Sequence, residues 1–495
     1  MKKKYKNIIW FHLDGIRPTK EYGDYKDRPD YLDEWAKEGI EYTNAYTAFP
    51  STVLSISSVM VGYPSSYFAR SFEDLQIDYS KFKPFFQLLK SSKYKIYSSL
   101  FYLPVRKNLK KMMFPIKKKY FPKNVKDYKY MWNSKEINRL TKSLLAKNKL
   151  SNPFLLYLQY SFTPIKGDDS LADAKKMFDF LKNRGYMDNS IVIVWADHGW
   201  PSKDKQNNRT RLQKTLEGHD LFITNDNIKV PLILIYPGCE KGLKVTTPVS
   251  TLDIAPTLLN HLEINASFGC PYFSKPLPLK NVKSPKRFFR VDTRNYFQKN
   301  KKTALHNGKY KLVIQSNGHN NFEFYDMVKD PYEKINQISN IIYKNLIFKF
   351  KNEFFNQEED LLNFHAEFMA EKLKFIFLKN KFKHLSILRS SNNLFNSVVL
   401  NGFKLLFPAA EIKLSDKPDF SDILIVPLTN QFKPKKIHCK NYYYIDYNFN
   451  LIKKPMPYKY MIRNFKSNWK TYLTQPKVFL RKVLVLILRE YEKLI

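Results

Sequence analysis

Two short polar elements, far apart in the chain, carry residue types that bind metal ions. Asp14 follows the apolar run of residues 7–13, and Asp197 and His198 follow the apolar run of residues 190–196. Side chains at the carboxyl ends of parallel strands converge on one crevice, so we expect these three residues to lie together. Carboxylate and imidazole groups are ligands for a divalent metal. The pattern therefore predicts a metal-dependent enzyme.

The segments around these residues alternate between strand and helix. Apolar runs of strand length cover residues 7–13, 152–159, 190–196 and 230–236. Helical patterns cover residues 31–39, 51–61, 170–183 and 251–261. This alternation is typical of an α/β domain with a parallel sheet covered on both faces.

The pattern changes after about residue 265. Residues 309–315 and 322–326 are short alternating segments, as in a small antiparallel sheet. Residues 341–380 read as helical. Beyond them lie strand candidates at 384–388, 403–407 and 423–427 and a helix candidate at 393–400. We expect a catalytic α/β domain at 1–265, an antiparallel subdomain at 266–340, and an additional basic helical and α/β module at 341–495, whose role the sequence leaves open.

Composition limits the partners of the chain. The 495 residues include 84 Lys and Arg against 45 Asp and Glu, a formal charge of +39. This charge favours an anionic partner. Lys is abundant along the whole chain, so the excess of basic residues also fits a general Lys-rich composition without a specific partner. No nucleic-acid motif accompanies the charge, so we expect no nucleic-acid partner.

The three cysteines are widely spaced, which argues against a disulfide framework and favours a reducing compartment.

The termini bear on location. Residues 7–13 are a strand-length apolar run without a cleavage site, so we expect no signal peptide. No run of about 18 uncharged apolar residues occurs, so we expect no membrane-spanning helix. Both observations favour a cytoplasmic protein. Between residues 423 and 489 the only acidic residue is Asp446, and residues 478–494 are apolar and basic. This tail fits either peripheral docking at the inner membrane face or on a lipid-linked glycan, or a helix packed on the protein.

Several segments, in order, resemble the sulfatases and their relatives in the alkaline phosphatase superfamily. These segments are residues 7–17, 31–47, 185–199, 230–238, 249–259 and 324–336. The last of them resembles the closing motif of the sulfatase C-terminal subdomain. The resemblance implies an alkaline-phosphatase-like α/β fold, with a mixed, mainly parallel sheet sandwiched by helices and a small C-terminal antiparallel subdomain.

The resemblance also implies roles for individual residues. It places the nucleophile at Thr52, with Ser51 and Ser55 within reach of a register error, and makes Thr52 a metal ligand together with Asp14 and the pair at 197–198. The implied cofactor is one divalent ion, zinc or manganese in preference to calcium or magnesium.

Two further positions match substrate contacts of the family. His219 matches a residue that approaches the substrate or leaving group, where it would be catalytic through proton donation or charge stabilisation. Arg17, in the first motif, is expected to bind the anionic ester.

The chain departs from the sulfatase pattern at informative positions. Sulfatases form formylglycine at a Cys or Ser followed by x-Pro-Ser-Arg, whereas residues 52–56 read Thr-Val-Leu-Ser-Ile. Threonine cannot supply that aldehyde. A histidine common in relatives is absent from residues 161–164 (Ser-Phe-Thr-Pro), and Asp14-Gly15 replaces two aspartates, which favours a single metal.

These features predict a metal-dependent phosphoester hydrolase or phospho(alcohol)transferase that acts through a metal-bound threonine. The anionic ester substrate is expected to be linked to a surface glycan or a lipid. Two alternatives stay open: a sulfuric ester hydrolase without the usual formylglycine motif, and a non-catalytic family member.

Overall fold

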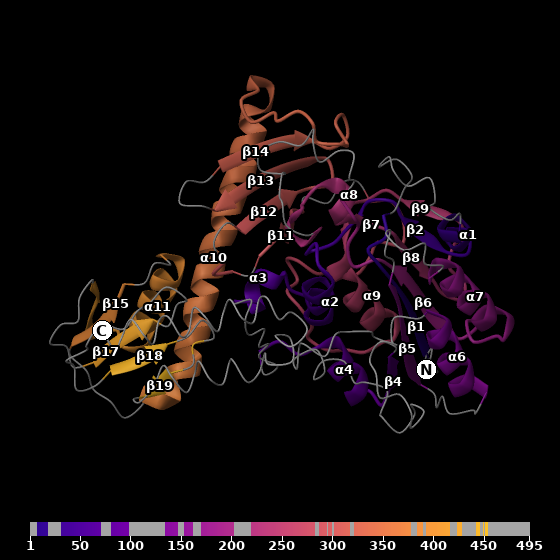
Figure 1. Cartoon of the computed structure of the whole chain (residues 1–495), viewed down its shortest axis with the longest axis horizontal. Coiled ribbons are helices and arrows are strands. Elements are labelled where there is room, and N and C mark those ends of the chain that lie inside the picture. Colours follow the sequence, from indigo (N-terminus) through magenta and orange to yellow (C-terminus); the bar gives the residue numbers. More distant parts are fainter. Residues whose placement is uncertain are drawn as a thin grey trace, which may run out of the picture. The chain divides into compact units, whose positions relative to one another are not determined.

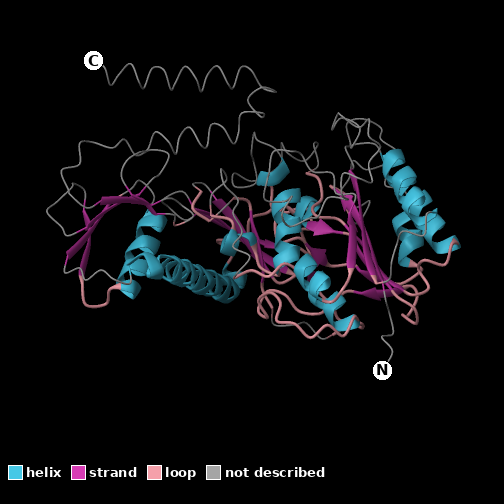
Figure 2. Ribbon diagram, turned by 90° about the horizontal axis from the view of Figure 1, so that it is seen from below, coloured by secondary structure: helices cyan, strands magenta, loops and turns pink. Residues whose placement is uncertain are grey.

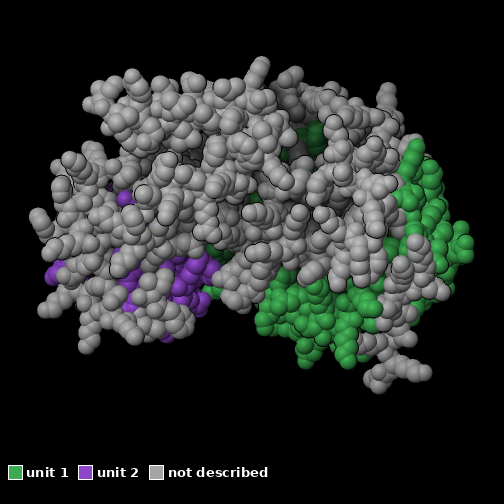
Figure 3. All heavy atoms as spheres, turned by 60° about the horizontal axis from the view of Figure 1, so that its bottom comes forward, with its two compact units in different colours: residues 1–101, 108–364 green, residues 102–107, 365–495 purple. Residues whose placement is uncertain are grey.

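A computed structural model shows how these segments fold. It describes residues 7–17, 31–70, 81–98, 134–146, 153–161, 170–201, 219–282, 287–294, 296–298, 301–316, 321–377, 384–389, 393–415, 423–427, 442–445, 449 and 451–453. The chain divides into two compact units, residues 1–101 with 108–364 and residues 102–107 with 365–495 (Figure 3). Each unit is described by itself.

A seven-stranded sheet forms the centre of the first unit (Figure 1). Its spatial order is β4 (Lys95–Ser98), β5 (Phe154–Ser161), β1 (Asn7–Asp14), β6 (Ser190–Trp195), β8 (Leu232–Ile235), β2 (Ile40–Tyr42) and β9 (Leu243–Val245). The first four strands pair in parallel, β8 pairs antiparallel with both neighbours, and β2 pairs in parallel with β9. The predicted mixed, mainly parallel sheet is confirmed.

Helices cover both faces of this sheet because β1 is apolar on both sides (Figure 2). On one face the Phe11 ring lies 6.1 Å from Trp35 of α1 (Tyr31–Ala36) and 5.7 Å from Phe178 of α7 (Ser170–Asn183). α6 (Ser134–Ala146) packs beside α7. On the other face Trp10 lies 6.0 Å from Phe85 of α4 (Phe85–Ser91). Alternate residues of β1 therefore serve opposite helical layers.

The helix α2 (Thr52–Val61) is buried along its whole length, which explains its mixture of serines and apolar residues. It ends at Gly62, whose φ of 71° is the left-handed conformation that glycine tolerates. A Cβ atom at Gly62 would lie 2.6 Å from the Cα atom of Gly269. This close approach admits only glycine. The neighbouring helices are α3 (Ser65–Phe68), α4, the 3-10 helix η6 (Thr251–Asp253) and α9 (Ile254–His261).

Two smaller sheets complete the first unit. A three-stranded sheet contains β10 (Val249–Ser250), β3 (Ala45–Tyr46) and β7 (Lys229–Val230), and β7 follows η5 (His219–Leu221) and α8 (Asn225–Ile228). A four-stranded antiparallel sheet contains β11 (Phe289–Asp292), β12 (Lys301–His306), β13 (Tyr310–Ser316) and β14 (Asn321–Asp326). The predicted antiparallel subdomain is confirmed. After the 3-10 helix η7 (Ile341–Tyr343), the helix α10 (Lys344–Phe377) begins, and its Phe350 packs edge-on against Phe324.

The second unit is a smaller α/β sheet. Its order is β16 (Glu411–Ser415), β15 (His384–Leu388), β17 (Ile423–Pro427), β18 (Tyr442–Ile445) and β19 (Leu451–Lys453), with α11 (Asn393–Leu406) after β15. The strand predicted at 403–407 is wrong, because α11 continues to Leu406. Phe395, Val399 and Phe403 recur at four-residue spacing and are all fully buried, as on the apolar face of a helix.

Within the part of the chain that the structure describes, no helix is both long and apolar enough to cross a membrane. The basic apolar segment 478–494 lies outside the described residues. The domain boundaries at residues 265 and 340 stay predictions.

Candidate functional site

Asp14 and Asp197 reach the same edge of the central sheet because their strands are parallel neighbours. His12 of β1 pairs with Trp195 of β6 in the register. Asp14 then ends β1, and Asp197 follows β6 after one further residue. The convergence predicted from the two strand ends is therefore present.

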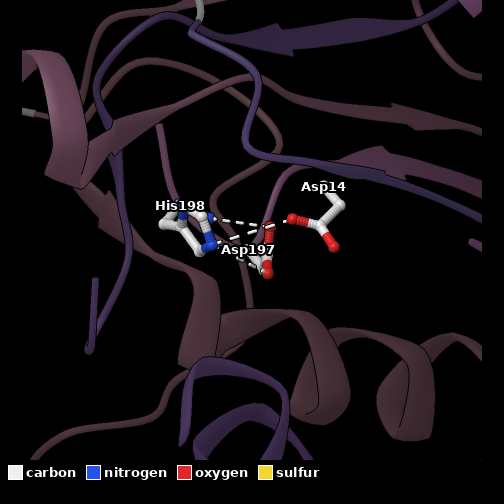
Figure 4. Close-up of side chains that lie close together, drawn as sticks. All are labelled: Asp14, Asp197 and His198. Carbon is white, nitrogen blue, oxygen red and sulfur yellow. Dashed lines mark hydrogen bonds and ion pairs between the residues drawn. The ribbon is translucent and has the colours of Figure 1, made fainter. Parts of the chain in front are cut away.

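The three predicted ligand side chains point toward one another (Figure 4). His198 Nε2 lies 3.7 Å from Asp14 Oδ1 and 3.5 Å from Asp197 Oδ2. One ligand atom from each residue lies within 4.8 Å of the other two. The Asp197 side chain is fully buried, whereas 17% of the Asp14 side chain is exposed. The cluster is therefore accessible from the Asp14 side.

The hydrogen bonds around the cluster fit a metal ion. Asp197 Oδ1 accepts the backbone N–H groups of Gly15 at 3.2 Å and His198 at 3.0 Å, whereas its buried Oδ2 accepts no hydrogen bond from the described residues. His198 Nδ1 lies 2.7 Å from the Gly199 carbonyl oxygen. A carbonyl oxygen only accepts, so Nδ1 is the donor in this contact and Nε2 is the ring nitrogen that faces the carboxylates. A divalent cation would satisfy both atoms.

Thr52 begins α2 and brings its hydroxyl to the same point. Thr52 Oγ1 lies 3.2 Å from His198 Nε2 and 3.5 Å from Asp14 Oδ1. The residue is buried, with 8% exposed. The first turn of a helix carries unpaired N–H groups and the positive end of the helix dipole, which favour an anion. The predicted nucleophile thus lies beside the candidate ligands, at a helix start that favours an anionic group.

The neighbouring hydroxyl groups are placed differently. Ser51 is the N-cap residue of α2 and makes no side-chain capping bond. Ser55 Oγ donates to the Asp197 carbonyl oxygen at 2.7 Å and lies 2.9 Å from Thr47 Oγ1, so it is occupied in fixing the chain behind Asp197. Of the three hydroxyl residues considered from the sequence, Thr52 is the one that contacts the ligand side chains.

The two carboxyl groups have unequal proton affinities. Burial and the nearby Asp197 carboxylate raise the pKa of Asp14 to about 6. Burial also opposes ionisation of Asp197, but His198 and His12 outweigh it and hold the Asp197 pKa below its usual range. The protein groups alone thus disfavour two charged carboxylates side by side. A divalent cation between them would offset this repulsion.

Three supporting residues were not identified from the sequence. His12 Nε2 lies 3.2 Å from Asp197 Oδ1, and His12 Nδ1 lies 3.1 Å from the Tyr157 hydroxyl. Gln159 Nε2 donates to Asp14 Oδ2 at 3.0 Å. The sequence pattern could have identified His12, because a residue two positions before Asp14 lies on the same face of β1. A polar residue in an otherwise apolar, buried strand also needs a hydrogen-bonding partner.

The two predicted substrate contacts are less fully described. Arg17 is buried, and its Nε donates to the Trp200 carbonyl oxygen at 2.6 Å, which ties the chain after β1 to the chain after β6. His219 begins η5, but its side chain lies outside what the structure describes. A substrate-binding role for both residues, and a catalytic role for His219, stay predictions.

The glycine after His198 is required by packing. A Cβ atom at Gly199 would lie 2.3 Å from the Asp226 carbonyl oxygen. The Gly199 N–H donates to the Asn227 carbonyl oxygen at 2.7 Å, and the Trp200 N–H donates to that of Asp226 at 3.2 Å. The segment around α8 therefore lies against the backbone that carries His198.

Parts of the chain are similar in sequence to known proteins. Residues 219–360 match the protein family described as N-sulphoglucosamine sulphohydrolase, C-terminal. A sulfatase of Formosa agariphila is 30% identical over 172 residues, 35% of this chain and 31% of that protein. Lipoteichoic acid synthase 1 of Bacillus subtilis is 33% identical over 108 residues, 20% of this chain and 16% of that protein. Each alignment spans under a third of the relative's length.

Solved structures share the fold. A protein of Bacteroides thetaiotaomicron described as a sulfatase has a TM-score of 0.54 at 15% identity, over 72% of this chain and 93% of that chain. The phosphonate monoester hydrolase of Agrobacterium radiobacter has a TM-score of 0.50 at 13% identity, over 72% of this chain and 96% of that chain. The resemblance seen in the sequence motifs is thus confirmed: residues 219–360 match a sulfatase family, part of the chain is similar to a sulfatase, and the solved structures share its fold.

Proposed function

We propose that the chain is a metal-dependent hydrolase or transferase of phosphoric esters, with Thr52 as the nucleophile. The observation that carries this proposal is the position of Thr52 Oγ1, 3.2 Å from His198 Nε2 and 3.5 Å from Asp14 Oδ1 at the start of α2. A hydroxyl so placed can attack an electrophile that binds at the accessible side of the cluster.

One divalent ion would be held by Asp14, Asp197, His198 and Thr52. When bound, the ion lowers the pKa of the threonine hydroxyl and neutralises charge on the ester oxygens. A set of two carboxylates, one imidazole and one hydroxyl suits zinc or manganese. Gln159 already occupies Asp14 Oδ2 as a hydrogen-bond donor, which favours a single ion over two.

The residues of the chain account for the remaining steps. Thr52 Oγ releases its proton to solvent and forms a bond to phosphorus, and the bond from phosphorus to the leaving alcohol breaks. The departing alkoxide takes up a proton, for which His219 is the predicted donor. A water molecule or an acceptor alcohol then attacks the same phosphorus atom and gives its proton to His219, while the bond from phosphorus to Thr52 Oγ breaks and this oxygen takes a proton from solvent. Water makes the chain a hydrolase, and an alcohol makes it a transferase.

The chemistry of threonine favours phosphate over sulfate. The usual sulfatase route needs a formylglycine aldehyde, which threonine cannot form, whereas a threonine alkoxide attacks phosphorus directly. The relatives support both ester classes, since they include sulfatases, a phosphonate monoester hydrolase and a lipoteichoic acid synthase. A substrate linked to a surface glycan or lipid, at the inner membrane face, is part of this proposal and agrees with the positive charge of the chain.

The test is a comparison of three variants on phosphate monoesters, phosphodiesters and sulfate esters with zinc or manganese. We expect Thr52→Ala to lose activity, Thr52→Ser to keep part of it, and Ser51→Ala to match the wild type, because Ser51 makes no capping bond. Mass spectrometry of the quenched wild type should find a phosphoryl or phosphoryl-alcohol adduct on Thr52. Full activity of Thr52→Ala would contradict the proposal.

Two alternatives remain distinguishable in the same experiment. Sulfate release without an adduct on Thr52 would identify a sulfuric ester hydrolase. A non-catalytic member would bind no metal. Metal analysis of the wild type and of Asp197→Ala separates this last case, because Asp197 Oδ2 is the buried oxygen that accepts no hydrogen bond from the described residues.

A further inference from the structure

The loop between β14 and α10, residues 327–343, carries a group of exposed apolar residues. Val328, Ile335, Ile341 and Ile342 are 66%, 61%, 75% and 82% exposed. Figure 1 shows the start of α10 beyond the edge of the four-stranded sheet, at the top of the view. Single exposed apolar residues are ordinary, but several within one short loop indicate an interaction surface.

The loop holds these side chains outward. Three of the four residues donate their backbone N–H to a neighbouring polar side chain: Val328 to Asp326 Oδ1 (3.2 Å), Ile335 to Asp330 Oδ2 (2.8 Å) and Ile342 to Asn340 Oδ1 (3.0 Å). Glu333, in the middle of the loop, is buried and pairs with Lys311 of β13. The backbone is therefore fixed at both ends and in the middle, which lowers the entropy cost of binding through this surface.

The charge that the loop presents to solvent is positive. Lys329, Lys334 and Lys344 are exposed. Asp326 and Glu333 are buried, and the half-buried Asp330 accepts the Ile335 N–H. Lysines around an apolar surface complement an anionic partner.

The residue types distinguish between a lipid and a protein partner. Protein interfaces are enriched in aromatic residues, methionine and arginine and depleted in lysine. Membrane-binding surfaces combine aliphatic side chains, which enter the headgroup region, with lysines that contact lipid phosphates. Exposed valine and isoleucine flanked by lysine match the second class. Tyr332 of the same loop is 38% exposed and is compatible with both classes, because tyrosine is also enriched at membrane interfaces.

We propose that the β14–α10 loop docks the chain onto an anionic lipid surface, with Val328, Ile335, Ile341 and Ile342 entering the headgroup region. This surface uses other residues than the basic segment 478–494, and it is independent of the chemistry at Thr52. It would hold the first unit at a membrane whether the substrate is a phosphate or a sulfate ester.

The test uses the full chain and phosphatidylcholine vesicles with and without phosphatidylglycerol. The double variant Ile341→Gln/Ile342→Gln removes apolar contact without changing charge, and neither residue is buried, so the fold is kept. Leu279→Gln/Val282→Gln is the matched control, because both residues are about half exposed elsewhere in the first unit. A second pair, Lys329→Gln/Lys334→Gln, is compared with Lys275→Gln/Lys280→Gln, which are also exposed.

We expect binding to vesicles that contain phosphatidylglycerol, and a loss of at least about tenfold in the isoleucine variant, or about 1.4 kcal/mol. The lysine variant should bind more weakly and with a smaller salt dependence. Hydrogen exchange should slow at residues 327–343 on vesicles. Unchanged binding in both loop variants would overturn the proposal, even if the chain binds through another segment. Dimerisation in solution that the isoleucine variant abolishes, without vesicle binding, would overturn it in favour of a second copy.

Discussion

Removal of Lys311 tests how the antiparallel sheet supports the candidate metal site. Lys311 of β13 is fully buried and pairs with Glu333, and its Nζ donates to the Ile223 carbonyl oxygen at 2.8 Å and lies 3.3 Å from Asn225 Oδ1. Lys311→Met leaves the Glu333 carboxylate buried without its cation. Breaking a buried pair in this way costs about 3–5 kcal/mol, or roughly 6–10 °C in Tm at about 2 °C per kcal/mol.

The expected loss depends on pH. Burial already raises the pKa of Glu333 against the charge of Lys311, and without Lys311 the folded-state pKa rises further. A carboxyl whose pKa is raised on folding binds more protons in the folded state, so the variant should lose stability as pH rises above about 4.5. We therefore expect a larger Tm deficit at pH 8 than at pH 5.

Two further variants complete this test. Lys311→Met/Glu333→Gln should recover most of the deficit, because no unpaired charge is left. Lys309→Met is the matched control on an exposed residue of the same hairpin, with an expected change within about 0.5 kcal/mol. The segment held by Lys311 contacts the backbone after His198, so metal affinity should fall as well. Differential scanning fluorimetry and zinc titration measure both effects, and an unchanged Tm at pH 8 would refute the reasoning.

Three other predictions follow from the site and its surroundings. His12→Asn should lower zinc affinity about 10- to 100-fold with a smaller effect on Tm, measured by competition with a chelating dye, because His12 positions the Asp197 carboxylate; equal affinity would contradict this role. Gly199→Ala should reduce metal binding and ester turnover at least about tenfold, since its Cβ would meet the Asp226 carbonyl oxygen. Burial opposes ionisation of Asp292, but Arg290 holds the pKa of its carboxyl below 3.8. The ionised carboxyl therefore stabilises the fold above pH 3.8, and this contribution is lost as pH falls through the lowered pKa. The free energy of unfolding of Asp292→Asn should accordingly fall less steeply with decreasing pH in that range, measured by acid unfolding.

The central domain could be predicted because its apolar runs end at polar residues that are candidate metal ligands. The run of residues 7–13 stops at Asp14, and the run of residues 190–196 stops at Asp197, so strand ends and candidate ligands were marked by the same change of residue type. The helix Ser170–Asn183 was found at its observed bounds, since its apolar residues follow the helical period and Gly185 ends it.

Other features depend on packing that a single sequence does not display. The reversed direction of β8 follows from the short β7 and its pairing with β3, not from the apolar run itself, which reads the same in both directions. The wrong strand at 403–407 has a similar cause. Gly402 comes so close to Met369 and to the Ala366 carbonyl oxygen of α10 that the segment packs as a helix against a helix.

The residues of the candidate metal site differ in their exposure to solvent. Asp197 and His198 are sealed behind the sheet edge, and Ser55, Gly15 and His12 contact Asp197 from the protein side. Thr52 is buried, with 8% exposed, whereas 17% of the Asp14 side chain is exposed. Among the described residues, the Asp14 side is therefore the accessible approach to the Thr52 hydroxyl. The buried candidate ligands are thus held by hydrogen bonds from the protein, whereas the proposed nucleophile is positioned by the first turn of α2.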